Sequence, residues 1–152
     1  MVEIVPFSSK FSTAFKELNY EWISELFKIE SEDIKVLSNP QSEIIDKGGH
    51  ILIALKDGEP LGTCALLKAD NQEYELAKMA VSRNARGQKI GWKLGQAIIE
   101  KAKEIGAKKL FLQTNSSLGP AIALYQKLGF KSACGADYSF SRCDIKMEIP
   151  LS

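Results

Sequence analysis

The feature that most constrains the fold is a change of hydrophobic period between residues 73 and 114. The run Glu73–Val81 is apolar enough for a buried strand, and the apolar residues within 90–105 then recur at the i, i+4, i+7 and i+8 spacing of an amphipathic helix. Lys109–Thr114 is a second apolar run, typical of a strand. Two strands joined by a helix form a right-handed parallel crossover. The sequence therefore predicts a sheet that contains a parallel pair.

The rest of the chain predicts antiparallel neighbours for this pair. Apolar runs predict further strands, at residues 2–5, 50–56, 61–69 and 142–149. Periodicity and end signals predict further helices, at residues 11–26, 39–48 and 116–129. Ser116 or Ser117 is expected to cap the last of these. Together the elements predict a mixed α/β (α+β) fold, with a mostly antiparallel sheet of about six to seven strands, helices on both faces and one parallel β-α-β unit.

Length and charge limit the remaining possibilities. The 152 residues suit one domain, residues 1–152, because no linker-like stretch divides them. A net charge of +1 gives no argument for nucleic acid or an anionic membrane as a partner. No apolar run approaches the ~20 residues of a membrane span. Three cysteines without metal-ligand spacing, a single histidine and the lack of a signal-peptide pattern predict a cytoplasmic protein with no bound metal.

The loop between the first strand and its helix has the composition of an anion site. It consists of Arg86, Gly87, Gln88, Lys89, Ile90 and Gly91. The first N–H groups of a helix have no internal acceptors, glycine lets a ligand approach the backbone, and the two basic residues add positive charge. Neither the nucleotide P-loop pattern nor the dinucleotide fingerprint is present. On this segment alone, a solvated connection fits as well as a phosphate-binding loop.

Two motifs resemble those of the GNAT superfamily of acetyl-CoA-dependent N-acetyltransferases. The first is the Arg/Gln-x-x-Gly-x-Gly/Ala pattern after a strand that ends in Val, here Val81 followed by the loop from Arg86 to Gly91, with Lys89 where the family usually has glycine. The second is Asn115 followed by Ala121-Ile-Ala-Leu-Tyr125 and Leu128-Gly129-Phe130. The resemblance covers about half of the chain. It implies that the parallel β-α-β unit binds the cofactor.

The resemblance also implies where acetyl-CoA would lie. The backbone of Met79, Ala80 and Val81 would pair with the pantetheine arm between two splayed parallel strands. A bulge there would direct an amide at the thioester carbonyl and stabilise its developing negative charge. The pyrophosphate would lie on the loop from Arg86 to Gly91, and Asn115 would contact the pantetheine arm.

Two catalytic residues are implied in the same way. Tyr125, four residues before Gly129, would be the general acid that protonates the departing thiolate of coenzyme A, although its helical spacing also fits a core aromatic. Glu75, about eleven residues before Arg86, would be the general base, because an ammonium has no lone pair with which to attack. Alternation places Glu73 on the same side of the strand, so Glu75 is also interpretable as one of several edge acids.

Other side chains near these positions are weaker candidates. In a regular strand Lys78 would lie on the face opposite Glu75 and Met79. Three aromatic residues are candidates for the wall of an acceptor pocket: Tyr20, Trp22 and Tyr138. The first two fit the apolar stripe of the 11–26 helix equally well.

The predicted function is an N-acetyltransferase that moves an acetyl group from acetyl-CoA to a primary amine of a small molecule or protein, by direct transfer. The resemblance is compatible with a homodimer. One alternative is a coenzyme A-binding sensor or regulatory module without turnover, which would keep the phosphate loop and lose the acid–base pair. Another is a protein-interaction domain on the same scaffold, which would not bind coenzyme A, since a fold alone does not settle function.

Overall fold

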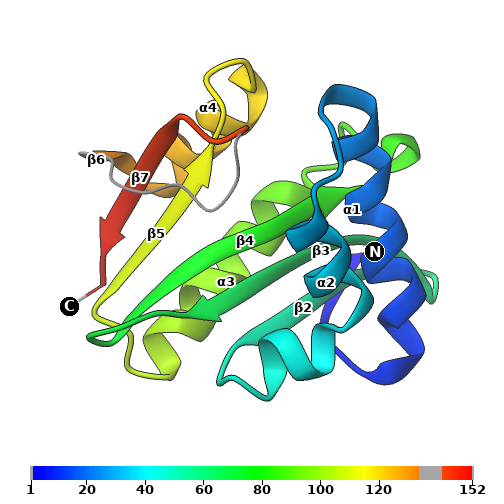
Figure 1. Cartoon of the computed structure of the whole chain (residues 1–152), viewed down its shortest axis with the longest axis horizontal. Helices are drawn as coiled ribbons and strands as arrows, with labels where there is room; N and C mark the ends of the chain where they lie inside the picture. Colours follow the sequence, from blue (N-terminus) through cyan, green and yellow to red (C-terminus); the bar gives the residue numbers. More distant parts are fainter. Residues whose placement is uncertain (1, 134–141, 152) are drawn as a thin grey trace.

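The computed structural model describes residues 2–133 and 142–151. Within these residues, seven strands form one sheet in the order β1-β2-β3-β4-β5-β7-β6 (Figure 1). The strands are β1 (Val2–Pro6), β2 (His50–Lys56), β3 (Glu59–Lys68), β4 (Glu73–Val81), β5 (Lys109–Thr114), β6 (Lys131–Ala133) and β7 (Ile145–Pro150). In this part of the chain β4 and β5 are parallel and the other neighbouring pairs are antiparallel. The predicted fold class is confirmed.

Helices cover both faces of the sheet. The helical segments of the described residues are η1 (Ser9–Phe11), α1 (Ser12–Leu26), α2 (Ser31–Ser38), η2 (Gln41–Ile45), η3 (Arg83–Ala85), α3 (Ile90–Glu104) and α4 (Gly119–Leu128). In Figure 1, α1 and α2 lie on the near face and α3 lies behind the sheet. Among the described residues, no helix combines the length and the apolar character needed to cross a lipid bilayer.

Each face of the sheet has its own apolar core, because strand residues alternate between the two faces. On β2, Ile51 and Ile53 are buried in the core under α1 and α2, whereas Ala54 is buried in the core under α3. Phe15 of α1 fills the first core and Leu94 of α3 fills the second, and both are 0% exposed. Burial of such a side chain contributes about 1.5–3 kcal/mol. The two cores hold β4 in the middle of the sheet.

The sequence does not predict α2. A reciprocal pair of hydrogen bonds fixes its start: the Asp33 carboxylate accepts from the Glu30 N–H at 2.8 Å, and the Glu30 carboxylate accepts from the Asp33 N–H. This capping box has acids at both positions, and the helix is eight residues long, too short for a periodic signal. The helix predicted to start at Asn39-Pro40 is a five-residue π-helical turn, Gln41–Ile45.

The start of α4 also differs from the prediction. The residue before the helix is Leu118, which makes no side-chain cap. Ser116 instead donates from its N–H and its hydroxyl to the Asp144 carboxylate, at 2.8 and 2.9 Å. The N–H of Ser117 donates to Oδ1 of Asn115 at 2.8 Å. The predicted serine cap is therefore wrong, because contacts with the segment before β7 and within the loop engage both residues.

A β-bulge interrupts β4 beside β3. The register of the two strands shifts between Thr63 and Ala65 of β3, because two residues of β4, Lys78 and Met79, lie opposite a single residue of β3. Lys78 adopts a φ of 54°, outside the extended region of a regular strand. An extra residue in one strand inverts the alternation of the side chains beyond it. The bulge implied by the sequence resemblance is thus present.

The bulge changes which side chains share a face. Leu76 is buried in the core under α3, so its neighbour Glu75 faces the side of α1 and α2. Beyond the bulge, Met79 packs against the α3 core, while Lys78 reaches Asp33 of α2 with an Nζ–Oδ1 distance of 3.9 Å. Lys78 therefore lies on the same face as Glu75. The expectation that it lies opposite is wrong, since it assumed a regular strand.

Candidate functional site

The parallel strands β4 and β5 are paired at one end and separate toward the other. Their register runs from Glu73 opposite Lys109 to Glu75 opposite Phe111. Beyond this point β4 runs toward α1 and β5 runs toward α4 (Figure 1). A cavity of about 710 Å³ lies between the separated ends. The arrangement matches the splayed pair that the sequence resemblance implies.

The cavity gathers the residues that the sequence singles out. The predicted site residues that line it are Glu75, Met79, Ala80, Val81, Arg86, Gly87, Lys89, Ile90, Gly91, Asn115 and Tyr125. Gln88 does not line it, and its side-chain oxygen accepts a hydrogen bond from Lys56 Nζ at 3.0 Å. Glu75 and Tyr125, which are 50 positions apart in the chain, thus lie on the wall of one cavity.

The loop that enters α3 has the backbone geometry of an anion site. Gly87 and Lys89 have φ angles of 86° and 60°, and Lys89 is the N-cap of α3 without a side-chain cap hydrogen bond. A Cβ built on Gly87 would meet nothing within 4 Å, so the loop leaves open space beside its backbone. The first N–H groups of the helix, from Ile90 onward, have no acceptor within the helix and carry its positive partial charge. Such an end can hold a phosphate.

Glu75 is a half-buried carboxyl at the point where β4 and β5 separate. Its Oε2 accepts a hydrogen bond from Gln113 Nε2 of β5 at 3.2 Å. Burial raises the pKa of Glu75 from 4.5 to about 7, against the opposing effects of Lys78, Lys146 and the Gln113 hydrogen bond. A carboxyl with this pKa is partly ionised at neutral pH and can accept a proton from a ligand.

Tyr125 of α4 is a buried phenol on the cavity wall. Its side chain is 8% exposed, and its ring packs edge-on against Phe130 with the ring centres 6.1 Å apart. Burial raises the pKa of Tyr125, and the neighbouring Cys64 adds to the effect. The hydroxyl therefore keeps its proton at neutral pH and is available as a proton donor. The placement agrees with both interpretations of the sequence, since the ring belongs to the core and the residue lines the cavity.

Asn115 lines the cavity, but its side chain is engaged within the protein. Its Nδ2 donates to the main-chain carbonyl of Arg142. Its Oδ1 accepts from both the N–H and the hydroxyl of Ser117. Asn115 therefore holds the loop between β5 and α4 against the segment that precedes β7.

The cavity has a buried charge cluster that the sequence does not predict. Arg142 lines the cavity and donates two hydrogen bonds to the Asp33 carboxylate, at 2.9 and 2.6 Å, and one to Glu30 at 3.3 Å. The Asp33 side chain is 0% exposed. Burial would raise the pKa of Asp33, but the hydrogen bonds from Arg142 and from the Glu30 N–H lower it below its ordinary value. A contact between residues 109 positions apart leaves no local pattern in a sequence.

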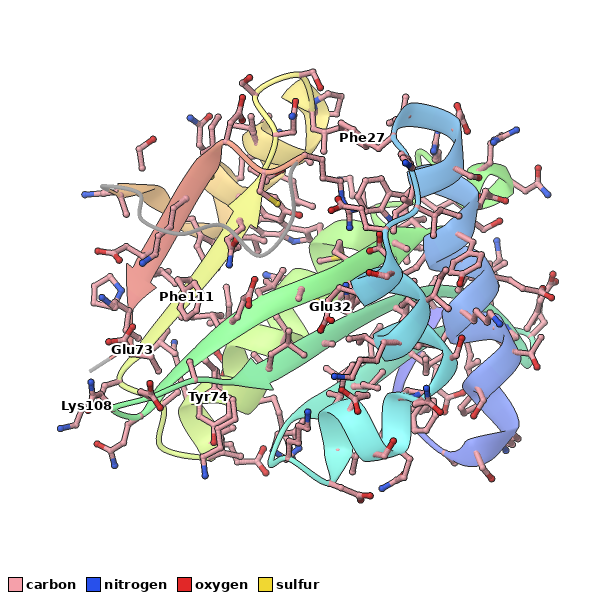
Figure 2. The ribbon with its side chains drawn as sticks, viewed as in Figure 1. Phe27, Glu32, Glu73, Tyr74, Lys108 and Phe111 are labelled. Atoms are coloured by element: carbon pink, nitrogen blue, oxygen red, sulfur yellow. The ribbon has the colours of Figure 1, made fainter. Side chains whose placement is uncertain are left out.

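The aromatic candidates divide between cavity and core. Trp22 lines the cavity, and the Arg142 guanidinium carbon lies 5.9 Å from the centre of its ring. Tyr20 packs in the core under α1 and α2, and Tyr138 lies outside the described residues. Phe27, which the sequence does not single out, also lines the cavity, edge-on to Trp22 at 6.2 Å. Figure 2 shows Phe27 near the top of the view, far from Glu73 at the paired end of β4.

Comparison with known proteins identifies the family. Residues 13–130 match the model of the acetyltransferase (GNAT) family. The uncharacterized N-acetyltransferase YvbK of Bacillus subtilis (strain 168) is 32% identical over 118 residues, which cover 76% of this chain and 73% of that protein. The chain belongs to the GNAT family of acetyltransferases. Its predicted function as an N-acetyltransferase, and with it the class of acyltransferase enzymes, is confirmed, while the acceptor stays unidentified.

Solved structures confirm the fold. A GNAT-family acetyltransferase from Staphylococcus aureus Mu50 superposes with a TM-score of 0.90 at 22% identity, covering 100% of both chains. The paiA N-acetyltransferase from Thermoplasma acidophilum, solved in complex with coenzyme A, superposes with a TM-score of 0.80 at 20% identity, covering 99% of each chain. The GNAT enzyme described here therefore has the sheet order and helix placement of its family.

Proposed function

We propose that the cavity between β4 and β5 binds acetyl-CoA, and that the enzyme transfers the acetyl group directly to a primary amine of a small molecule or protein bound at the same time. Three features support this assignment. β4 and β5 separate and so leave backbone edges with which a pantetheine arm can pair. The loop into α3 offers an anion site. The cavity of about 710 Å³ connects the separated strands to this loop. The coenzyme A complex of the paiA enzyme, which shares the fold, supports the choice of donor.

In this proposal acetyl-CoA, the acetyl donor, lies along β4 and its pyrophosphate lies at the start of α3. Backbone groups of residues 79–81 pair with the pantetheine arm, and an N–H of the bulge donates to the thioester oxygen. The loop of residues 86–91 holds the pyrophosphate through its N–H groups and through the positive charges of Arg86 and Lys89. Asn115 contributes to the wall by holding the loop that follows β5.

The observation that carries the proposal is a proton acceptor and a proton donor on one cavity wall. A free amine has an ordinary pKa of about 10.4 and reaches the site as an ammonium. Glu75, with its pKa of about 7, accepts the surplus proton. The bulge N–H stabilises the oxygen on which negative charge develops, and Tyr125 gives its hydroxyl proton to the departing sulfur. General acid and base groups of this kind each contribute ~10²–10⁴-fold to the rate.

Calorimetric titration with acetyl-CoA, followed by an assay of coenzyme A release over a panel of primary amines, tests the proposal. We expect binding with a Kd of about 1 μM and release that depends on the amine. Arg86→Ala should weaken binding, whereas Lys127→Ala, on α4 outside the cavity lining, should not. Binding without release from any amine would contradict the catalytic roles, and a lack of binding would overturn the assignment of the cavity.

A further inference from the structure

Lys78 is a charged side chain of the cavity wall that the proposed chemistry does not use. Its side chain is 7% exposed and lines the cavity together with Glu75. In a regular strand it would point into the apolar core under α3, but the bulge turns it to the face of Glu75. A lysine with a φ of 54° is uncommon, and such conformations cluster at functional sites.

The Lys78 ammonium lies beside the charge cluster of Asp33, Glu30 and Arg142. Its Nζ lies 3.9 Å from Oδ1 of Asp33, beyond hydrogen-bond distance. The Asp33 carboxylate is already engaged by Arg142, at 2.6 and 2.9 Å, and by the Glu30 N–H at 2.8 Å. Burial lowers the pKa of Lys78, the nearby Arg142 charge lowers it further, and the carboxylates of Asp33, Glu75 and Glu32 oppose these effects. Toward Asp33, Lys78 thus contributes charge beside the Asp33–Arg142 pair.

Several groups face the Glu75 carboxyl from the elements around it. Lys78 on β4 and Lys146 on β7 both favour its ionised form, and Lys78 has the larger effect. Gln113 on β5 donates a hydrogen bond to it. The half-buried thiol of Cys143, before β7, also faces Glu75 and does not supply a positive charge. Of these groups, Lys78 combines a full charge with deep burial.

We propose that Lys78 is a positioning residue for acetyl transfer: its ammonium, placed on the Glu75 side of β4 by the bulge, favours the carboxylate form of Glu75, which accepts the proton of the amine. This inference rests on the proposed role of Glu75 as the base. Lys78 acts through its charge and not by contact with the reacting atoms. The effect is larger than at a surface, because solvent and salt screen a buried pair less.

Lys146 provides a natural comparison within the same site. It carries the same charge and also faces Glu75, but it is only partly buried and its Nζ lies over the Phe111 ring at 5.0 Å. If the position of Lys78 at the bulge matters, removing the charge of Lys78 must raise the titration midpoint of Glu75 more than removing the charge of Lys146. If the carboxyl responds only to the general positive field, the two removals must have similar effects.

The test is an NMR titration of the Glu75 carboxyl carbon in the full-length protein labelled with ¹³C-glutamate, with Glu75→Gln to assign the resonance. Lys78→Met should raise the titration midpoint by about one pH unit, because an opposite charge nearby lowers a carboxyl pKa by about 1–3 units when fully effective. Lys78→Arg should keep the wild-type midpoint, and Lys146→Met should raise it less. The acid-side midpoint of kcat/KM against pH should move with the NMR midpoint in each variant.

An unchanged midpoint in Lys78→Met, or a change no larger than that of Lys146→Met, would overturn the inference. So would a kcat/KM profile that does not follow the NMR midpoint. If Lys78→Met does not fold, Lys78→Gln provides the same comparison, since both remove the charge. The proposed function fails separately: it would be contradicted if Glu75→Gln kept the wild-type pH profile, whatever Lys78 does to the carboxyl.

Discussion

Replacing Glu75 with glutamine should make the enzyme more stable above neutral pH and slower. The glutamine oxygen can still accept the hydrogen bond from Gln113, but the side chain cannot ionise. Burial raises the pKa of Glu75 from 4.5 to about 7, and each pKa unit corresponds to about 1.4 kcal/mol. The ionised carboxylate therefore lowers the free energy of unfolding by about 3 kcal/mol at a pH above both values. The glutamine variant lacks this penalty.

The direction of this change in the free energy of unfolding depends on whether the folded or the unfolded state holds the proton of Glu75. Below the unfolded pKa of 4.5, the carboxyl is protonated in both states and the wild type carries no penalty. As the pH rises toward about 7, the unfolded chain releases its proton while the folded protein retains it, so the folded state loses stability. The stability difference between Glu75→Gln and wild type should grow from near zero to about 3 kcal/mol across this window.

Urea denaturation followed by tryptophan fluorescence, at pH values from about 4 to about 8, measures this difference. Glu73→Gln is the matched control, because Glu73 lies on the same strand and its Oε1 is 3.6 Å from Lys109 Nζ in a partly exposed ion pair. That variant should lose about 1 kcal/mol or less. A constant offset between Glu75→Gln and wild type at all pH values, or a glutamine variant no more stable near pH 8, would refute the reasoning.

If Glu75 is the base, as proposed, the same ionisation governs the rate. Above about pH 7 the wild type has its base in the carboxylate form, so Glu75→Gln should lower kcat/KM by about 10²-fold or more there. Below this pH the wild-type carboxyl is itself protonated, and the two proteins should converge. Stability and activity then change in opposite directions with pH, as is common for groups that catalysis keeps in an unfavourable environment.

Three further substitutions or treatments test other parts of the site. Tyr125→Phe should lower kcat by about 10²-fold or more while the Kd for coenzyme A stays nearly unchanged, because the ring still packs on Phe130 and only the proton donor is lost; an equal loss of binding would assign Tyr125 to packing. Lys89→Gly should raise the free energy of unfolding in urea by up to about 1 kcal/mol. A non-glycine residue at a φ of 60° costs about 1–2 kcal/mol, and the greater entropy of glycine in the unfolded chain offsets part of the gain. A lower urea midpoint would contradict this. Cys64 is 0% exposed and burial raises its pKa, so mass spectrometry should find it alkylated in urea and unmodified in the folded protein; equal modification in both would refute its burial.

Elements whose signals are local could be predicted from the sequence. The bounds of β2, β4 and β5, which are His50–Lys56, Glu73–Val81 and Lys109–Thr114, agree with the predicted strands. Runs of apolar residues and the change of period at the loop of residues 86–91 are sufficient to predict these elements. Glu75 and Tyr125 could be placed on one cavity because the family resemblance relates their strand and helix, which periodicity alone does not. Their catalytic roles stay predictions.

Features that depend on contacts distant in sequence could not be predicted. The family resemblance implied a bulge in β4, but the residue types of β4 do not show at which position it lies, so the side that Lys78 occupies did not follow from the sequence. The serines before α4 have cap-like composition, but Ser116 is engaged by Asp144. The cluster of Asp33 and Arg142 joins two ends of the chain. The single domain over residues 1–152, the cytoplasmic location, the lack of metal and the compatibility with a homodimer also stay predictions of the sequence.

The pairing of Asp33 with Arg142 has a consequence for synthesis of the protein on the ribosome. The two residues are 109 positions apart, so at about 5–20 residues per second Arg142 is made roughly 5 to 20 s after Asp33. Until then the carboxylate of Asp33 has no guanidinium to pair with, and burying it would be costly. β4 and α3, which flank the loop of residues 86–91, are synthesised well before this point. A nascent chain arrested ahead of Arg142 would therefore contain the whole loop of residues 86–91 but lack the guanidinium that pairs with Asp33.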